Sequence, residues 1–293
     1  MNFIAIDIGG TNIKYGVLNH NGEILYTSKL KTSITPTNNF ILEDINLIIT
    51  SILKDYSIEG VAISTAGVVS PSLGEIIYAS SNIPNYIGTN FKKHIKEKFN
   101  LNCQVENDVN CAALVEMWLG SGKGYSSLFC ITIGTGIGGA LIIDKKIVPG
   151  VSNSAGEVGY LNLGNGEIQK IASTKALVNA ISKKSHEKVH GEAIFKKAKE
   201  GDALCIEEIN KVIENIANLI VTINYVVNPE VFILGGGIME QEDFIKPILI
   251  NKIKEKVSYN FIKNTNINFA SLGNKAGMVG ALYNYLYKNY KQD

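Results

Sequence analysis

The pattern that most constrains the fold occurs twice in these 293 residues: an apolar strand, a glycine-rich turn and a returning strand. Residues 3–18 form it around Gly9 and Gly10, and residues 128–143 form it around Gly134–Gly139. A dinucleotide-binding βαβ unit would need a helix directly after its glycines, and here a strand follows in both places. The pattern therefore predicts two similar α/β halves that face each other across a central cleft.

Around these turns, short apolar runs alternate with segments of helical spacing. Further strands are expected at residues 23–29, 60–64, 102–106 and 231–234. Helices are expected at residues 40–53, 91–99, 110–119, 175–184, 191–200, 205–227 and 276–290.

Composition argues against several classes of function. The 28 basic residues, all lysine, balance 27 acidic residues to a net charge of +1, which gives no global reason to bind nucleic acid or an anionic membrane. Without arginine, phosphate must be held by lysine, backbone N–H groups or a metal. No apolar run reaches the roughly 20 residues that span a bilayer, and the first residues lack a signal-peptide pattern, so we expect a cytoplasmic protein.

The first glycine turn has the composition of a phosphate-binding loop. Glycines let the backbone approach a phosphate closely, and the neighbouring hydroxyl and amide add donors. The residues expected to contact nucleotide are Asp7, Gly9, Gly10, Thr11, Asn12 and Lys14. Asp7, at the strand end, is placed to hold Mg²⁺ through water. An ordinary hairpin turn explains this segment about equally well when it is taken alone.

A second and a third glycine segment strengthen the interpretation. Gly134, Thr135 and Gly136 lie in the same hairpin context as the first loop, and two such loops are what a bound nucleoside triphosphate requires. Gly235, Gly236 and Gly237 follow a strand and would let adenine or ribose lie flat against the backbone.

A carboxylate suited to general-base catalysis follows the strand at residues 102–106. Asp108 would take the proton of a sugar hydroxyl as that oxygen attacks the γ-phosphate of ATP. Asn107 could orient neighbouring hydroxyls. The alternative, that Asp108 only caps the following helix, would be favoured in isolation and is disfavoured beside the glycine loops.

Together these segments resemble the ROK family of sugar kinases and repressors, within the actin-like (ribonuclease H-like) ATPase superfamily. The resemblance covers essentially the whole chain and rests on Asp7–Thr11, Glu106–Asn110 with two alanines following, Ile131–Gly139, Gly156–Gly159 and Leu234–Gly237. It implies a smaller domain of residues 1–118, completed by the helix at about 276–293, and a larger domain of residues 119–275. It also implies ATP and Mg²⁺ as cosubstrates, a small sugar as the partner, and a homodimer.

By this resemblance Asp108 is the catalytic base. The residues implied in sugar binding are Asn82, Asn107, Glu157, Tyr160 and Gly67. A second sugar-binding glutamate of the family has no clear counterpart, and Glu167 and Gln169 are both possible.

Two departures from the family pattern narrow the substrate. The stretch Leu161–Ala172 contains no cysteine or histidine, so we expect no structural zinc there. Tyr160 stands where the family has a histidine. This zinc-free form resembles the N-acetylmannosamine kinases of sialic acid degradation, and a phenol ring suits an N-acetyl group. Neutral replacement of the histidine is the alternative.

Several rival functions stay open at this point. The same family includes glucokinases, N-acetylglucosamine kinases and β-glucoside kinases. It also includes sugar-responsive repressors, which carry a helix-turn-helix module before the first phosphate loop. Asp7 lies too near the start of this sequence to leave room for one, so we expect an N-acylmannosamine 6-kinase rather than a repressor.

Overall fold

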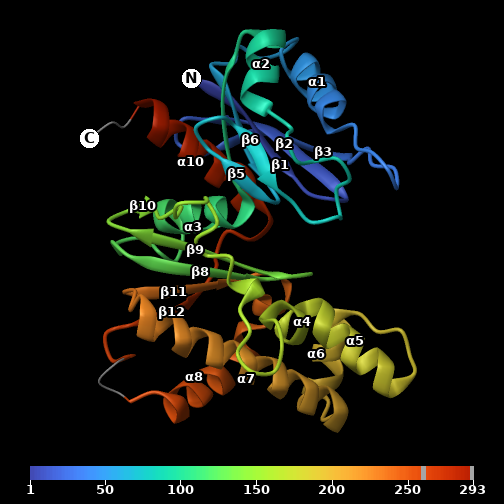
Figure 1. Cartoon of the computed structure of the whole chain (residues 1–293), viewed down its shortest axis with the longest axis vertical. Coiled ribbons are helices and arrows are strands. Elements are labelled where there is room, and N and C mark those ends of the chain that lie inside the picture. The colour runs from blue at the N-terminus through green and yellow to red at the C-terminus, as the bar shows by residue number, and fades with distance from the viewer. Residues whose placement is uncertain (259–261, 291–293) are drawn as a thin grey trace. The chain divides into compact units, whose positions relative to one another are not determined.

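The computed structural model of the protein describes residues 1–258 and 262–290. The chain forms two compact units, and Figure 1 labels most of their elements. Unit 1 consists of residues 1–118, 150–154 and 274–293, and unit 2 of residues 119–149 and 155–273. Each unit has a five-stranded mixed sheet with helices, so the predicted α/β fold class is confirmed.

The sheet of unit 1 has the strand order β3-β2-β1-β4-β7. Its strands are β1 (Asn2–Ile8), β2 (Asn12–Asn19), β3 (Ile24–Lys31), β4 (Gly60–Thr65) and β7 (Asn102–Asn107). β1, β2 and β3 form an antiparallel meander, while β4 and β7 run parallel to β1. A separate hairpin of β5 (Val68–Ser70) and β6 (Glu75–Tyr78) follows β4.

Helices cover both faces of this sheet: α1 (Ile41–Ile52) and α2 (Phe91–Phe99) lie on one face and α10 (Ala276–Tyr290) on the other, while α3 (Asp108–Leu119) follows β7. Side chains alternate between the faces of a strand, and Ile4 of β1 packs with Ile45 of α1 and Phe91 of α2. Phe3 points the other way and meets Tyr285 of α10, with ring centroids 5.2 Å apart. One face therefore belongs to α1 and α2, and the other to α10.

The sheet of unit 2 repeats the same arrangement, with the strand order β10-β9-β8-β11-β12. Its strands are β8 (Leu128–Ile133), β9 (Ile137–Ile143), β10 (Lys146–Ile147), β11 (Val231–Gly235) and β12 (Asn266–Phe269). Again the first three strands in sequence form an antiparallel meander, and the last two run parallel to the first. The internal repeat seen in the sequence therefore corresponds to two sheets of one topology.

The core of unit 2 lies between this sheet and a group of helices. They are α4 (Ile168–Ala172), α5 (Thr174–Ser185), α6 (Gly191–Lys199), α7 (Ala203–Val226) and α8 (Glu242–Lys256), with 3-10 turns at Val158–Tyr160, Gly237–Glu240 and Gly273–Lys275. Ile213, Ile216 and Ile220 bury one side of α7, which packs against α8 (Figure 1). No helix in the described part of the chain is long and apolar enough to cross a membrane.

The second glycine loop is shorter than predicted. Gly138 and Gly139 already belong to β9, so the turn itself is Gly134–Gly136. At Gly139 the backbone of Gly156 approaches so closely that a Cβ atom would overlap its carbonyl oxygen. These glycines are thus explained by packing as well as by ligand binding.

Other elements lack a sequence signal strong enough to predict them. The β5–β6 hairpin, β12 and α4 are only three to five residues long. α8 has 15 residues, but Pro247 lies inside it, and an internal proline normally ends a helix. The helix before β8 starts at Asp108 instead of the expected residue 110, for a reason given below.

The contact between α10 and α3 makes a testable prediction about stability. Alanine normally stabilises a helix by about 1 kcal/mol relative to glycine. At Gly280, however, a Cβ atom would overlap the backbone carbonyl of Cys111 in α3. We expect Gly280→Ala to lower the free energy of unfolding by about 1–3 kcal/mol, measured by urea denaturation. Gly191→Ala is the control, since its nearest atom would be at 3.6 Å; equal stability of both variants would contradict the close packing.

Candidate active site

The carboxyl ends of β1, β4 and β7 bring three polar side chains of unit 1 into one row. Asp7 pairs in register with Ser64, and Ser64 pairs with Glu106. Register partners in a parallel sheet point to the same face, which here is the face covered by α10. The next row contains Thr65 and Asn107 and points to the opposite face. The two predicted site residues Asp7 and Asn107 therefore leave the same sheet edge on different sides.

Asp7 is half-buried beside the first turn of α10. Ser64 Oγ donates a hydrogen bond to Asp7 Oδ1 at 2.8 Å, and the carboxylate lies against Gly277, where a Cβ atom would overlap it. Burial raises the pKa of Asp7, while the Ser64 hydrogen bond and the charge of Lys14 oppose this shift. Lys14 Nζ itself donates to Asn274 Oδ1 at 3.2 Å. One carboxylate in this position suits Mg²⁺ that takes its other ligands from water and phosphate.

The predicted first phosphate loop is a tight turn between β1 and β2. The Gly9 N–H donates to the carbonyl oxygen of Asn12 at 3.1 Å, and the Thr32 hydroxyl donates to the carbonyl oxygen of Gly9 at 2.7 Å. Thr11 and Asn12 are exposed beside Gly10. The loop is therefore held by its own backbone and by Thr32, which directly follows β3, and its polar groups are accessible.

Asn107 caps the helix that follows β7, and Asp108 Oδ1 also accepts a hydrogen bond from the Val109 N–H at 2.9 Å. Asn107 Oδ1 accepts hydrogen bonds from the backbone N–H groups of Val109 at 2.8 Å and Asn110 at 3.1 Å. α3 consequently begins with Asp108 as its first residue. Asn107 Nδ2 donates to the carbonyl oxygen of Gly67 at 3.0 Å. The Asn107 amide thus uses three of its four hydrogen bonds within the protein and keeps one N–H for a ligand.

The loop that carries Asn82 is anchored at the end of β4. Tyr86 is buried, and its hydroxyl lies 2.5 Å from Thr65 Oγ1. Asn82 itself is exposed. Gly67 has a φ of 99°, which favours glycine. The structure brings Gly67 and Asn107 into contact and leaves Asn82 on the surface of its loop.

In unit 2 the predicted second phosphate loop packs against the start of α5 and the third glycine segment. The Gly134 N–H donates to the carbonyl oxygen of Gly136 at 2.9 Å, and the N–H of Thr174, at the start of α5, donates to the carbonyl oxygen of Gly134 at 2.9 Å. Gly236 lies against Ile133, whose carbonyl oxygen would overlap a Cβ atom there. The second and third glycine segments are therefore packed together within this unit.

Each of the three glycine segments contains a position that faces open space. A Cβ atom added at Gly10, Gly134 or Gly237 would have no heavy atom within 4 Å. Other glycines in these segments pack closely, such as Gly235 against Ala270. The open positions are where a ligand can approach the backbone.

The segment Glu157–Tyr160 packs beneath the second loop, with Gly159 against the carbonyl group of Ile137. Partial burial raises the pKa of the Glu157 carboxyl, and within the described residues no hydrogen bond or ion pair holds this carboxylate. Tyr160 is 48% exposed. A partly buried acceptor without a protein donor is a place where a ligand hydroxyl can bind.

The two alternatives for the second sugar-binding residue occupy different surroundings. Gln169 Oε1 lies close to Gly136 of the second loop and to Gly159. Glu167 instead forms a 2.8 Å ion pair with Lys170, and the hydrogen bond from Lys170 lowers the pKa of Glu167. Of the two residues, Gln169 is the one that touches both parts of the candidate site.

A local turn stabilises the stretch where the family usually binds zinc. Asn162 Oδ1 accepts hydrogen bonds from the N–H groups of Gly164 at 3.0 Å and Gly166 at 3.3 Å. The N–H of Ile168 donates to the carbonyl oxygen of Leu161 at 2.8 Å, and Ile168 is fully buried. Among residues 1–258 and 262–290 there is no group of three or more His, Cys, Asp or Glu side chains placed to hold a metal ion.

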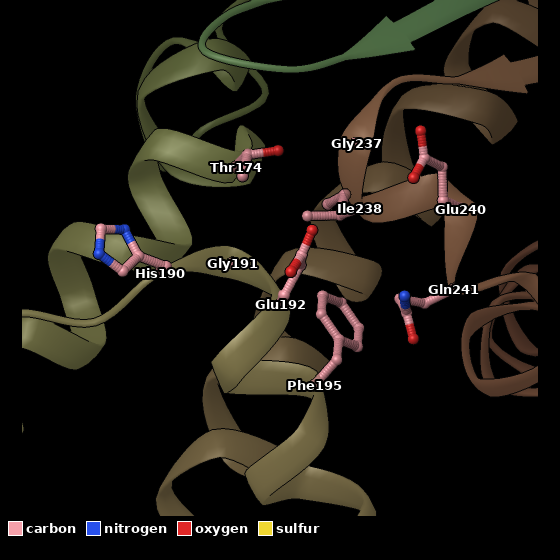
Figure 2. A pocket seen from close by; sticks show the side chains of 9 residues that line it. All are labelled: Thr174, His190, Gly191, Glu192, Phe195, Gly237, Ile238, Glu240 and Gln241. Atoms are coloured by element: carbon pink, nitrogen blue, oxygen red, sulfur yellow. The ribbon is translucent and has the colours of Figure 1, made fainter. Parts of the chain in front are cut away.

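A cavity of about 480 Å³ in unit 2 opens beside the third glycine segment. It is lined by Thr174, His190, Gly191, Glu192, Phe195, Gly237, Ile238, Glu240 and Gln241. Figure 2 shows Glu192 and Phe195 of α6 pointing toward Ile238 and Gln241. Its volume and its mixture of apolar and acceptor groups suit a small organic ligand such as a nucleoside.

A second, smaller cavity of about 260 Å³ lies beside the second phosphate loop. It is lined by Thr135, Gln169, Lys170, Ser173, Lys175, Ala176 and Asn179. Ser173 lines this cavity and Thr174 lines the larger one, so the start of α5 borders both.

Sequence reasoning missed most of the supporting residues. Ser64, Gly277, Thr174 and the α6 residues of the large cavity lie far in sequence from the glycine motifs they serve. Register between parallel strands would have pointed to Ser64, because it directly follows the apolar run of its strand. Nothing in the sequence alone points to the others.

Comparison with known proteins confirms the family resemblance. A model of the ROK family matches residues 3–288. An uncharacterised protein of Clostridium perfringens is 47% identical over 97% of both chains. A β-glucoside kinase of Listeria innocua is 29% identical over the full length of both chains.

Solved structures agree with this assignment. A Listeria monocytogenes protein proposed to be an N-acetylmannosamine kinase is 27% identical, with a TM-score of 0.87 over 98% of this chain and 99% of that one. A ROK family glucokinase of Streptomyces griseus, solved with glucose and the ATP analogue AMPPNP, is 27% identical, with a TM-score of 0.80 over 96% and 98% of the two chains.

The role of the close contact between Gly277 and Asp7 can be tested by adding a methyl group at residue 277. Gly277→Ala should displace the Asp7 carboxylate and weaken binding of Mg²⁺–ATP about tenfold, the effect of losing one charge-assisted interaction. Isothermal titration measures it. In an Asp7→Asn background the same substitution should have little further effect. Unchanged affinity in Gly277→Ala would show that Asp7 does not contribute to this site.

Proposed function

The chain belongs to the ROK family, and we propose that it is an ATP-dependent sugar kinase that phosphorylates O6 of N-acetylmannosamine. The general activity is supported by kinases of several sugars among its relatives and structural neighbours. The observation that carries the catalytic assignment is the position of Asp108 directly after Asn107, whose amide caps α3 and holds Gly67 and so fixes the backbone that carries the Asp108 carboxylate. Cytoplasmic location and a homodimer are part of the same proposal.

In the proposed reaction Asp108 accepts the proton of the sugar O6 hydroxyl while that oxygen bonds to the γ-phosphorus of ATP. The bond from this phosphorus to the β–γ bridging oxygen breaks, and ADP leaves with the electron pair. Backbone N–H groups of the two loops, with the Thr11 and Thr135 hydroxyls, offset the negative charge on the phosphates. Mg²⁺ held through water by Asp7 would add positive charge to the same phosphates.

We assign the adenosine part of ATP to the 480 Å³ cavity beside Gly237. We assign its phosphates to the smaller cavity on the other side of the start of α5, which Thr135 lines. Lys175 lines the smaller cavity there and can supply positive charge in a chain without arginine. Gly134 and Gly237, the open positions of the two glycine segments in unit 2, let the ligand approach the backbone.

The sugar assignment rests on Glu157 and Tyr160. The Glu157 carboxylate is a partly buried acceptor that suits a sugar hydroxyl, and the Tyr160 ring offers an apolar face for an N-acetyl methyl group. Likeness to the proposed N-acetylmannosamine kinase of Listeria monocytogenes supports this choice. Likeness to the β-glucoside kinase of Listeria innocua favours a β-glucoside as the second candidate.

A sugar panel decides between these candidates. Steady-state phosphorylation of N-acetylmannosamine, N-acetylglucosamine, glucose and a β-glucoside should give the highest kcat/KM for N-acetylmannosamine, by about tenfold or more over glucose. Tyr160→Ala should narrow this ratio and Tyr160→Phe should largely keep it, because the ring and not the hydroxyl faces the acetyl group. A preference for glucose or the β-glucoside would overturn the substrate assignment.

The base assignment has its own test. Asp108→Asn should lower kcat by about 10²–10⁴-fold and leave sugar affinity, measured by titration calorimetry, within about twofold. Asp144→Asn is the matched control, since asparagine tolerates the positive φ of 50° at that exposed turn. Near-normal turnover of Asp108→Asn would refute its role.

A further inference from the structure

Glu106 is a buried carboxylate that the proposed reaction leaves without a role. It lies at the end of β7, two residues before Asp108, and is 4% exposed. Its register with Ser64 and Asp7 directs its side chain to the face of the sheet that α10 covers. A carboxylate in such surroundings is costly unless donors and a positive charge compensate it.

Three donors surround the Glu106 carboxylate. Oε1 accepts hydrogen bonds from the Asn107 N–H at 3.0 Å and from Asn110 Nδ2 at 2.9 Å. Oε2 lies 3.4 Å from Nζ of Lys288, in the last turn of α10. The Glu106 side chain is 5% exposed and that of Lys288 is 30% exposed, so the ion pair is formed by a buried acid and a lysine that reaches in from the surface.

A second lysine stands near this pair without replacing Lys288. Lys92 Nζ donates to the carbonyl oxygen of Pro71 at 2.6 Å. Burial lowers the pKa of Lys92, and the charge of Lys288 lowers it further. Lys92 thus serves the turn after β5, and Lys288 provides the ion pair that compensates Glu106.

The two hydrogen bonds to Oε1 bracket Asp108. Asn107 precedes it and Asn110 follows it, and both are tied to Glu106. Asn107 in turn caps the helix through the N–H groups of Val109 and Asn110. The backbone that carries the Asp108 carboxylate is therefore fixed from both sides by one buried acid.

We propose that Glu106 and Lys288 are positioning residues for Asp108: the ammonium group at the end of α10 pairs with the Glu106 carboxylate and holds it in place, and Glu106 holds the first turn of α3 in its reactive position. This inference rests on the proposed function of Asp108 as the base. It gives α10 two tasks in unit 1, since the first turn of the same helix touches Asp7.

A double-mutant cycle tests the proposal with the full-length enzyme and the sugar that it phosphorylates best. Lys288→Met should lower kcat by about 10–100-fold, the cost expected for a catalytic group displaced by about 1 Å, with KM for sugar and ATP within about twofold. Lys288→Arg should recover most of the activity. In the Glu106→Gln background residue 106 carries no charge for Lys288 to compensate, so Lys288→Met should change kcat by less than about twofold.

A matched ion pair in unit 2 controls for stability effects. The Glu208 side chain is 8% exposed, and its Oε1 lies 2.8 Å from Lys211 Nζ and 2.7 Å from Lys184 Nζ. Removal of both lysines in Lys184→Met/Lys211→Met should leave kcat unchanged. Melting temperatures of all variants separate a loss of folded protein from a loss of turnover. If Lys288→Met alone does not fold, kcat of the Glu106→Gln/Lys288→Met protein is measured instead.

The outcomes distinguish this inference from the proposed function. Normal kcat in Lys288→Met, beside an inactive Asp108→Asn enzyme, overturns the positioning role alone. An active Asp108→Asn enzyme overturns the base assignment and with it this inference. Equal losses from Lys288→Met in the wild-type and Glu106→Gln backgrounds would show that Lys288 acts independently of Glu106.

Discussion

The close approach of α10 to the sheet of unit 1 is the contact on which the other features of this unit depend. Gly277 lies against the Asp7 carboxylate and Gly280 against the backbone of Cys111, and neither position has room for a Cβ atom. The first turn of α10 contacts Asp7 and its last turn contacts Glu106, so the position of this helix determines the surroundings of both acids. α10 is thus bound directly to the edge of the sheet that carries Asp7 and Glu106.

In unit 2, glycines likewise allow backbone segments to pack closely against one another. Gly139 lies against Gly156, Gly159 against Ile137, and Gly236 against Ile133. Each contact brings one backbone segment against another without an intervening side chain, which places the second loop, the Glu157–Tyr160 segment and the third glycine segment together. Glycine-rich sequence in this protein therefore has two physical meanings, and space around each residue separates them: packing glycines are enclosed, and those available to a ligand are open.

Because glycine serves both packing and ligand binding, the sequence predicted the fold better than it predicted the ends of the glycine loops. The pattern of strand, glycine turn and returning strand in residues 3–18, and its repetition in residues 128–143, was enough to predict the two hairpins and the α/β class. It could not tell that Gly139 belongs to a strand, because a packing glycine and a loop glycine look alike in sequence. Lys288 could not be predicted either, since its contact with Glu106 joins residues 182 positions apart and depends on the angle of one helix across the sheet.

The hydrogen bonds of Asn107 bear on where sugar selectivity arises. An amide that caps α3 and holds Gly67 has a single N–H to offer, so it can orient a hydroxyl but discriminates poorly between sugars. Glu157 has a whole carboxylate to offer, and Tyr160 adds an aromatic surface. Under the proposed function, selection among sugars should therefore rest mainly on Glu157 and Tyr160 of unit 2, while unit 1 carries the proposed base, Asp108. Under this division, changes of substrate within the family would alter the Glu157–Tyr160 segment and leave the Glu106–Lys288 pair in place.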